Sequence, residues 1–304
     1  MKSTDSRIVV LAALAGNIVI AASKFLAAFL TGSSAMIAEG IHSLADTLNQ
    51  VFLLIGLRRA RKEANFLHPF GFSGESYFWS FIVAIFLFTV GAIFSIYEGW
   101  QKLRAPQPVE KIHYAFAVLA VAWVVEFLTF RLAFKRINYE KKDVGIIHYL
   151  RKTKRAELLV VFLEDLAALV GLTIAAVMLA VEYLTGILIF DGLASVFIGV
   201  LLAVVALFLG METKSLLIGE GADPALLHHV YQIFRKEENV NRVIHIKSLQ
   251  LGPEDILLAA KVEFDHHLTM AEISRVIDGI EREIRQQYPE FKKIFVEPDI
   301  CRYS

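Results

Sequence analysis

Six long apolar stretches occupy most of the first 213 residues, and shorter polar segments separate them. Because a helix rises about 1.5 Å per residue, each stretch is long enough to cross about 30 Å of hydrocarbon. The pattern predicts a membrane α-helical protein with a six-transmembrane-helix bundle over residues 1–213. The predicted spans are residues 8–31, 35–57, 76–101, 113–134, 157–184 and 188–212.

From residue 214 the pattern becomes that of a water-soluble mixture, and we predict a separate α+β domain over residues 214–304. Asp223 and Pro224 are typical of a helix start, as are Thr269 and Glu272, which have the spacing of a capping box. Alternating apolar residues indicate strands. Helix, strand, strand, helix and strand are predicted over residues 224–236, 243–250, 256–264, 270–289 and 292–297.

The composition agrees with a membrane protein and narrows its chemistry. Of 304 residues, 56% are hydrophobic, and the mean hydropathy is +0.54. The net charge is zero, so there is no general basic field and nucleic acid is not expected as a partner. Cys301 is the single cysteine, which excludes an internal disulfide and a cysteine-based zinc cluster. A metal site would therefore use nitrogen and oxygen ligands.

Basic residues mark one side of the predicted bundle. Lysine and arginine gather in the loops after the second and fourth spans, whereas the opposite loops are poorer in them. Because such residues concentrate on the cytoplasmic side, both termini are predicted to be cytoplasmic. The basic residues of the two loops are Arg58, Arg59, Arg61, Lys62, Lys135, Arg136, Lys141, Lys142, Arg151, Lys152, Lys154 and Arg155.

The second span carries Glu39, His42 and Asp46 within an apolar helix. Four residues separate His42 from Asp46, which places both on one helix face within reach of one cation. Ionised side chains in a bilayer cost at least about 2.5–3.5 kcal/mol each, so they usually mark an ion path. The alternative is a buried polar contact that only holds helices together.

The fifth span carries two adjacent acids, Glu164 and Asp165. Neighbouring residues in a helix point about 100° apart, so Asp165 is the firmer candidate, although the longer Glu164 side chain could bend toward the same site. Together with His42 and Asp46 they would supply one imidazole and two or three carboxylates. Such a set suits a divalent transition metal, and a helix-packing network is the alternative.

Other polar residues are weaker candidates for metal binding. Lys24 is expected to snorkel or to pair with an acid, and Asn49 could orient a ligand. Asp191, at the start of the sixth span, is expected to be a helix cap. His68 lies in a short loop motif, His-Pro-Phe-Gly-Phe, where an exposed histidine is the alternative to a ligand. The histidines of the C-terminal domain show no clear ligand spacing.

The sequence resembles the cation diffusion facilitator family of metal transporters. The resemblance rests on the six spans, on Gly-Ser-Ser-Ala-Met-Ile-Ala-Glu-Gly-Ile-His-Ser-Leu-Ala-Asp in the second, on the His-Pro-Phe-Gly-Phe loop and on the C-terminal α+β domain. It implies a ferredoxin-like, metallochaperone-like cytosolic domain that dimerises. It also implies a homodimer that exchanges a divalent cation for protons at a site between spans two and five.

By position, the resemblance implies that His42, Asp46 and Asp165 are metal ligands. Val161 stands where the family usually has a fourth ligand, and Glu164 appears beside Asp165 instead. This form is similar to the branch that contains the mitochondrial zinc transporter and its bacterial relatives. Asn65 and Phe72 stand where loop ligands often occur. The C-terminal domain has Glu297 and Asp299 where a metal-binding histidine and aspartate can occur.

We therefore expect a proton-coupled exporter of a divalent cation in a bacterial inner membrane, with zinc ahead of iron, manganese, cobalt and cadmium. The metal is the transported substrate, and no cofactor is expected. A membrane-anchored metal sensor or scaffold is the rival interpretation. The sequence has no P-loop, dinucleotide-binding, serine-hydrolase or zinc-protease motif, so an enzyme is not expected. An intramembrane hydrolase using His42 is weaker still, because no nucleophile accompanies it.

Overall fold

The computed structural model describes residues 3–109, 111–140, 145–146, 149–150 and 153–300, with the side chains of 3–16 and 140 excepted. Contacts within the chain define two compact units. The first, here called the membrane unit, contains residues 1–57 and 78–213; the second, the soluble unit, contains residues 58–77 and 214–304. Lys141, Lys142, Arg151 and Lys152 of the predicted basic loop, and Cys301, lie outside the described residues.

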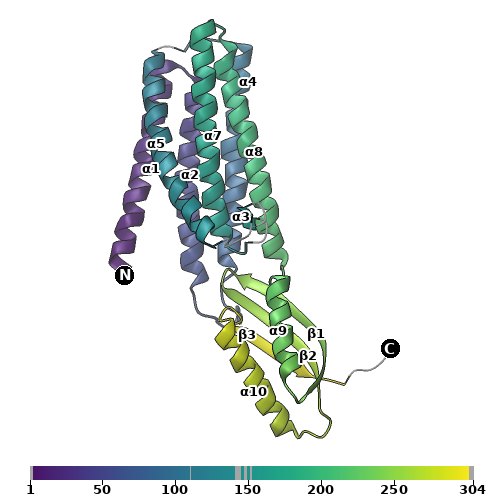
Figure 1. Ribbon diagram of the computed structural model, residues 1–304. Coiled ribbons are helices and arrows are strands. Elements are labelled where there is room, and N and C mark those ends of the chain that lie inside the picture. Colours follow the sequence, from purple (N-terminus) through teal and green to yellow (C-terminus); the bar gives the residue numbers. More distant parts are fainter. Residues whose placement is uncertain (1–2, 110, 141–144, 147–148, 151–152, 301–304) are drawn as a thin grey trace. The chain divides into compact units, whose positions relative to one another are not determined.

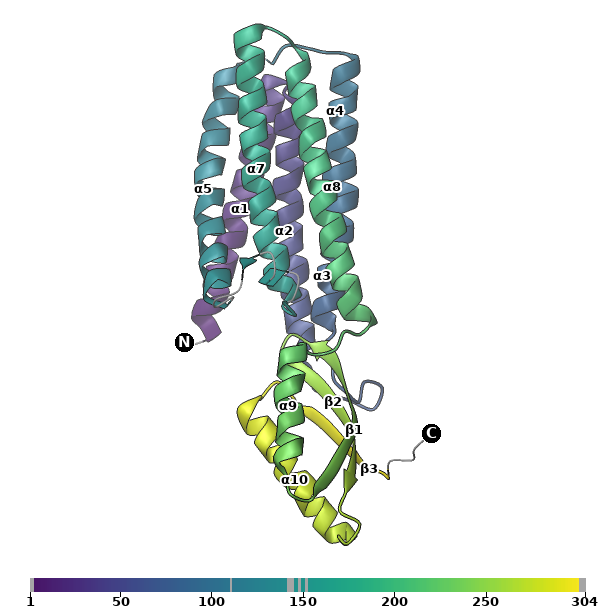
Figure 2. The same ribbon diagram turned by 45° about the vertical axis from the view of Figure 1, so that its right-hand side comes forward.

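The membrane unit is a bundle of long helices, which lie side by side in Figures 1 and 2. Each predicted span falls on a described helix or helical run, with ends that differ by a few residues. The elements are α1 (Ser3–Thr31), α2 (Ser34–Ala60), α3 (Glu75–Phe86), η1 (Leu87–Ile93), α4 (Phe94–Arg104), α5 (Ile112–Glu140), α7 (Ala156–Thr185) and α8 (Ile189–Ile218).

The length and apolar character of these helices identify a multi-pass membrane protein. In the described part of the chain, four helical runs are long and apolar enough to cross a bilayer: residues 75–104, 112–139, 156–185 and 189–218. In α1 the described apolar stretch, Asn17–Thr31, is shorter than these four. Helix α2 is 27 residues long, but its sequence is interrupted by the polar residues of the candidate site.

Glycine residues allow the backbones of α4 and α8 to come into close contact. A Cβ atom added at Gly99 would lie 2.7 Å from the carbonyl oxygen of Gly192, and one at Gly199 would lie 2.8 Å from the backbone nitrogen of Ile96. Any larger residue would force the helices apart. Such contacts are the usual basis of close helix packing in membranes, where van der Waals contact replaces the hydrophobic driving force.

The third span contains a feature that the sequence pattern did not predict. Residues Leu87–Ile93 form a π-helical segment between α3 and α4. Thr89 Oγ1 of this segment donates to the carbonyl oxygen of Ile85, in the last turn of α3, at 2.9 Å. π-helical segments are rare and short and depend on tertiary packing, so an apolar run alone predicts only a continuous helix.

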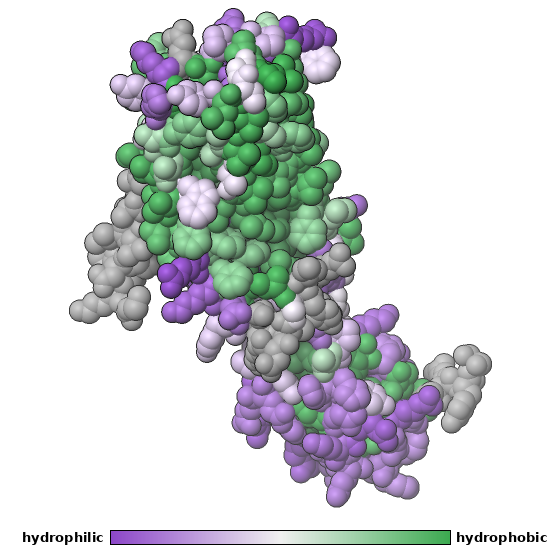
Figure 3. All heavy atoms as spheres, turned by 45° about the horizontal axis from the view of Figure 1, so that its top comes forward, coloured by the Kyte–Doolittle hydropathy of each residue, from purple (hydrophilic) through white to green (hydrophobic). Residues whose placement is uncertain are grey.

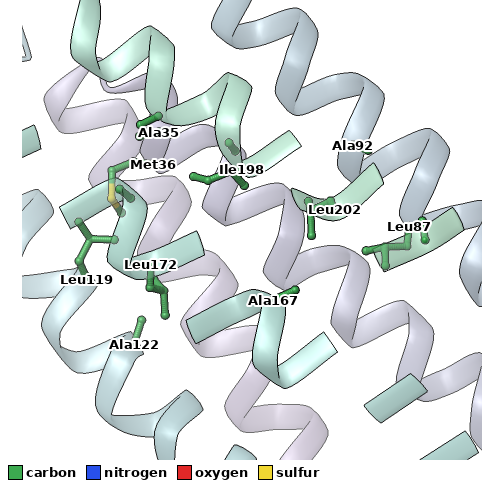
Figure 4. Close-up of a cluster of buried hydrophobic side chains, with 14 of the residues drawn as sticks. Ala35, Met36, Leu87, Ala92, Leu119, Ala122, Ala167, Leu172, Ile198 and Leu202 are labelled. Atoms are coloured by element: carbon green, nitrogen blue, oxygen red, sulfur yellow. The ribbon is translucent and has the colours of Figure 1, made fainter. Parts of the chain in front are cut away.

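The core of the bundle is built from apolar side chains of several helices. Figure 4 shows Met36 of α2 near Leu119 of α5 and Leu172 of α7, with Ile198 and Leu202 projecting from α8. All five are 2% exposed or less. The face in Figure 3 shows a broad apolar surface over the membrane unit. Large outward-facing hydrophobic side chains, such as Phe29 at 87% exposure, suit contact with lipid.

The soluble unit contains α9 (Pro224–Lys236), β1 (Val240–Gly252), β2 (Asp255–Phe264), α10 (Met270–Gln287) and β3 (Lys293–Pro298). The sheet order is β1-β2-β3, with β1 and β2 antiparallel and β2 and β3 parallel. Both helices share an apolar core with the sheet. The predicted small α+β fold is thus confirmed.

Two predicted helix starts in the soluble unit have the expected hydrogen bonds. The Asp223 carboxylate accepts a hydrogen bond from the backbone nitrogen of Ala225 at 2.7 Å. At α10, the Glu272 side chain accepts from the backbone nitrogen of Thr269 at 2.8 Å, and the capping box is complete. These caps satisfy backbone donors that a helix leaves unpaired at its first turn.

Candidate metal site

Helix α2 carries a polar stripe on one face. Successive residues of the stripe are three, one, three and three positions apart, which keeps them within an arc of about 120° on a regular helix. The stripe consists of Glu39, His42, Ser43, Asp46 and Asn49. Glu39, His42 and Asn49 are fully buried, and the Asp46 side chain is 15% exposed. Such a stripe within a membrane helix must face other helices or a polar path.

His42 and Asp46 lie together, as their spacing predicts. Nδ1 of His42 is 3.5 Å from Oδ1 of Asp46, which is too long for a strong hydrogen bond. Among the described residues, both ring nitrogens of His42 and Oδ1 of Asp46 are buried without a hydrogen-bond partner. Buried polar atoms are normally paired, so three unpaired atoms on adjacent side chains indicate a ligand site.

Glu164 of α7 reaches the same stripe. The side-chain nitrogen of Asn49 donates to Oε1 of Glu164 at 2.6 Å, so Asn49 does orient a candidate ligand. Glu164 is 4% exposed. Asp165 follows it in the helix and is partly buried. The sequence favours Asp165 over Glu164, yet it is Glu164 that hydrogen-bonds to α2, through Asn49.

The four predicted ligands do not form a closed coordination shell. In the part of the chain that the structure describes, no group of three or more histidine, cysteine, aspartate or glutamate side chains is close enough to hold a metal ion. The structure brings His42 to Asp46 and Glu164 to Asn49, one turn further along α2. The ligand set as a whole remains a prediction.

Lys24 of α1 forms a buried ion pair beside this site. Its Nζ lies 3.0 Å from Oε2 of Glu39 and donates to Oγ of Ser43 at 2.6 Å. Lys24 and Glu39 are both fully buried. The sequence predicts that Lys24 pairs with an acid or snorkels, and the structure selects the first alternative. The partner could not be read from sequence, because nothing there shows which helices are neighbours.

The other oxygen of Glu39 lies against α7. A Cβ atom added at Gly171 would be 2.7 Å from Oε1 of Glu39, and this oxygen has no hydrogen-bond partner among the described residues. Gly171 lies seven residues after Glu164, which is two helical turns along the same face. Helices α2 and α7 therefore meet along the polar stripe, at Asn49 and again at Glu39.

Asp191 of α8 holds the N-terminus of α2. Its carboxylate accepts hydrogen bonds from the backbone nitrogens of Ser34 at 2.7 Å and Ala35 at 3.1 Å, and from the hydroxyl of Ser33. Lys102 Nζ lies 3.5 Å from the same carboxylate. The sequence predicts that Asp191 is a helix cap. Its side chain caps α2, which is far from α8 in the sequence.

Among the described residues, the secondary sites suggested by the sequence contain no group of three or more side chains that could hold a metal ion. His68 is exposed, and its ring packs against Phe72 with the centroids 4.3 Å apart. In the soluble unit, Lys261 Nζ lies 2.7 Å from Asp299 and 3.3 Å from Glu297. Hydrogen bonds to these two carboxylates raise the pKa of the Lys261 ammonium, the bond to Asp299 most. The two acids that the resemblance suggests as ligands thus contact an ammonium.

Comparison with known sequences identifies two family matches that together cover most of the chain. Residues 10–218 match the cation efflux transmembrane domain, and residues 222–301 match the cytoplasmic domain of cation efflux proteins. A solved structure of the MamM C-terminal domain covers 26% of this chain and 100% of its own length, at 14% identity and a TM-score of 0.25, which is too low to carry an argument.

Curated relatives share moderate identity with the chain. A human protein named proton-coupled zinc antiporter SLC30A9, mitochondrial, is 33% identical over 244 residues, which is 80% of this chain and 43% of the relative. Metal tolerance protein C4 of Arabidopsis thaliana is 30% identical over 84% of this chain and 56% of its own length. The manganese efflux system protein MneP of Bacillus subtilis is 25% identical over 96% and 95%. The chain thus spans about half the length of the human and Arabidopsis relatives.

Proposed function

Since this chain belongs to the cation diffusion facilitator family of metal transporters, we propose that it exports zinc from the cytoplasm in exchange for protons. The observation that carries the proposal is the buried pair His42 and Asp46, whose three unpaired polar atoms lie inside the membrane unit. A polar contact that only held helices together would pair these atoms, because an unpaired buried polar group is costly.

The proposed ligands are His42, Asp46 and Asp165, with Glu164 as the fourth. One imidazole nitrogen and carboxylate oxygens suit zinc, which accepts tetrahedral nitrogen and oxygen coordination. Val161 cannot coordinate a metal, so a carboxylate from Glu164 would complete the set. The four side chains are not gathered in the structure, so metal binding would have to bring the side chains of α2 and α7 closer together.

Proton exchange would follow from competition for the same atoms. Metal binding requires a neutral imidazole and deprotonated carboxylates, so each bound metal displaces protons. Imidazole titrates near neutral pH in its ordinary state, which suits this exchange. By analogy with other secondary transporters, rocking of the bundle would expose the site to each side in turn.

The choice of zinc draws support from the relatives. The human and Arabidopsis relatives are 33% and 30% identical, and the first is named a zinc antiporter. The Bacillus relative, named for manganese, is 25% identical. The proposed setting is a bacterial inner membrane with both termini in the cytoplasm, and the proposed assembly is a homodimer formed partly by the soluble unit.

Sealed proteoliposomes test the proposal against a membrane-anchored sensor or scaffold. Purified protein would be assayed for uptake of zinc, iron, manganese, cobalt and cadmium in parallel. We expect zinc uptake above that of empty vesicles, and its loss in Asp46→Asn, which keeps the side-chain size but removes the charge. Metal binding without uptake of any of these metals would contradict transport and support the sensor or scaffold.

A further inference from the structure

Lys24 is a buried cation within a turn of the proposed metal ligands. Its ammonium contacts Glu39 and Ser43, and these residues lie on either side of His42 in the sequence of α2. Ser43 is also one turn before Asp46 on the same face. The chain therefore places an ammonium group next to the atoms that would receive a divalent cation.

Glu39 belongs to the same face, and one of its two carboxylate oxygens is paired. Oε2 bonds Lys24, and Oε1 lies against the backbone of α7 at Gly171. Without the ammonium, Glu39 would be a further carboxylate one turn from His42, since residues three apart are neighbours on a helix. Lys24 thus has two effects on a metal at this site, and both weaken its binding.

We infer that Lys24 is an affinity-limiting residue, whose ammonium weakens metal binding by holding Glu39 out of the ligand set and by repelling the bound dication. The inference rests on the proposed function. A transporter must release its metal as well as bind it, so a site with a fixed opposing charge favours turnover over retention. Glu39 offsets the cost of burying the ammonium.

The test is zinc binding by calorimetry at one neutral pH, on full-length protein in detergent. Lys24→Met removes the positive charge and frees Glu39. We expect zinc affinity to rise at least about tenfold, because charges about one helical turn apart interact by more than about 1.4 kcal/mol inside a protein, which is a factor of ten. Glu39→Gln leaves the ammonium uncompensated, so affinity should fall at least about tenfold. The double variant removes both charges and should bind within about threefold of the wild type.

These opposite signs separate an electrostatic role from a structural one. If the pair only packs helices, both single variants should change affinity in the same direction or leave it unchanged, which would overturn the inference. Lys24→Arg keeps the charge and should stay close to the wild type. If Lys24→Met does not fold, the comparison of Glu39→Gln with the double variant measures the same removal of charge. Failure of both single variants to fold would assign the pair a structural role and overturn the inference.

Lys102→Met provides a matched control. Lys102 donates to the carbonyl oxygen of Gly32 at 2.7 Å, two residues before α2 begins at Ser34. His42 lies eight residues beyond Ser34, or about 12 Å along the axis. Lys102→Met should therefore change zinc affinity less than Lys24→Met does. An equal rise in affinity would contradict a local effect of Lys24. Absence of zinc binding to the wild type would instead contradict the proposed function.

Discussion

At the scale of single residues, some polar atoms of the candidate site lack hydrogen-bond partners in the part of the chain that the structure describes. This distinguishes the site from a network that only packs helices together. The charges of Lys24 and Glu39 are paired through Oε2 of Glu39, whereas both ring nitrogens of His42 lack a hydrogen-bond partner among the described residues. Neutral imidazole is a common metal ligand because it offers a lone pair without a charge to desolvate. The site therefore contains one pair whose charges compensate each other, Lys24 and Glu39, and one pair open to a ligand, His42 and Asp46.

Glu164 is expected to be a ligand, and Glu164→Gln tests it. The amide keeps the size of the side chain but is a poorer metal ligand than a carboxylate, so zinc affinity should fall several-fold or more. Calorimetric titration at two pH values measures the effect and the protons released. Wild-type zinc affinity in this variant would reduce Glu164 to a packing partner of Asn49.

Asp165 is expected to be essential for transport but not for folding. Asp165→Ala removes a ligand and also the cost of keeping a carboxylate in the membrane. Zinc uptake should be lost while the thermal unfolding temperature in detergent stays the same or rises. An Asp165→Ala protein that transports at the wild-type rate would remove Asp165 from the site, and Asp165→Asn distinguishes loss of charge from loss of volume.

The residues could be nominated from sequence, but their partners could not. Isolated acids and a lysine in apolar spans stand out by their cost in a bilayer, so Lys24 and Glu164 are visible at once. The pairing of Lys24 with Glu39, and of Asn49 with Glu164, depends on which helices meet. Helix periodicity gives the face of each residue but not its neighbour.

At the scale of elements, α2 is held at its start and near its middle. The Asp191 carboxylate of α8 accepts from its first backbone nitrogens, and Asn49 bonds Glu164 of α7. A carboxylate at a helix N-terminus satisfies unpaired donors and complements the helix dipole. The helix that carries His42 is thus positioned by two others, neither adjacent to it in the chain.

Asp191→Asn should therefore destabilise the membrane unit. An amide presents one acceptor oxygen and an NH₂ group to a cluster of donors, so buried donors lose partners at a cost of about 1–3 kcal/mol. Thermal unfolding in detergent measures the loss. Asp223→Asn is the control, because asparagine is as good an N-cap as aspartate and little change is expected there. Equal stability of Asp191→Asn and the wild type would contradict the cap.

The capping box of α10 gives a pH-dependent prediction. Hydrogen bonds from the backbone and side chain of Thr269 lower the pKa of Glu272 below its ordinary value of 4.5. A lowered pKa means that the stabilisation is present above pH 4.5 and is lost as the pH falls through the folded-state pKa. The protection of the amides in the first turn of α10 against hydrogen exchange, taken relative to the intrinsic exchange rate at each pH, should therefore fall below pH 4.5 in the wild type but not in Glu272→Gln.

At the scale of the whole molecule, hydropathy predicts the membrane spans well. It does not predict that the segment between α2 and α3 belongs to the soluble unit. The spans follow from bilayer thickness, which fixes the length of an apolar helix. Residues 58–77 group with the soluble unit, where Ser73 Oγ donates to Oδ2 of Asp255 at 2.6 Å. The two residues are 182 positions apart, and no local pattern reports such a contact.

The proposed homodimer is tested by mass. In mild detergent at micromolar concentration, light scattering corrected for bound detergent should give twice the chain mass of 34.1 kDa. The cytoplasmic domain match over residues 222–301 motivates this expectation. A monomer mass at that concentration would contradict the dimer without affecting the site in the membrane unit.

The central claim is that zinc and protons exchange at the site formed by α2 and α7. The most direct measurement records zinc and pH together inside proteoliposomes that contain the purified protein. With zinc added outside and no imposed pH gradient, zinc should enter while protons leave, and an imposed gradient with acid inside should accelerate zinc entry. His42→Ala should abolish both movements together. Zinc entry that proceeds without proton movement, or survives His42→Ala at the wild-type rate, would contradict the account.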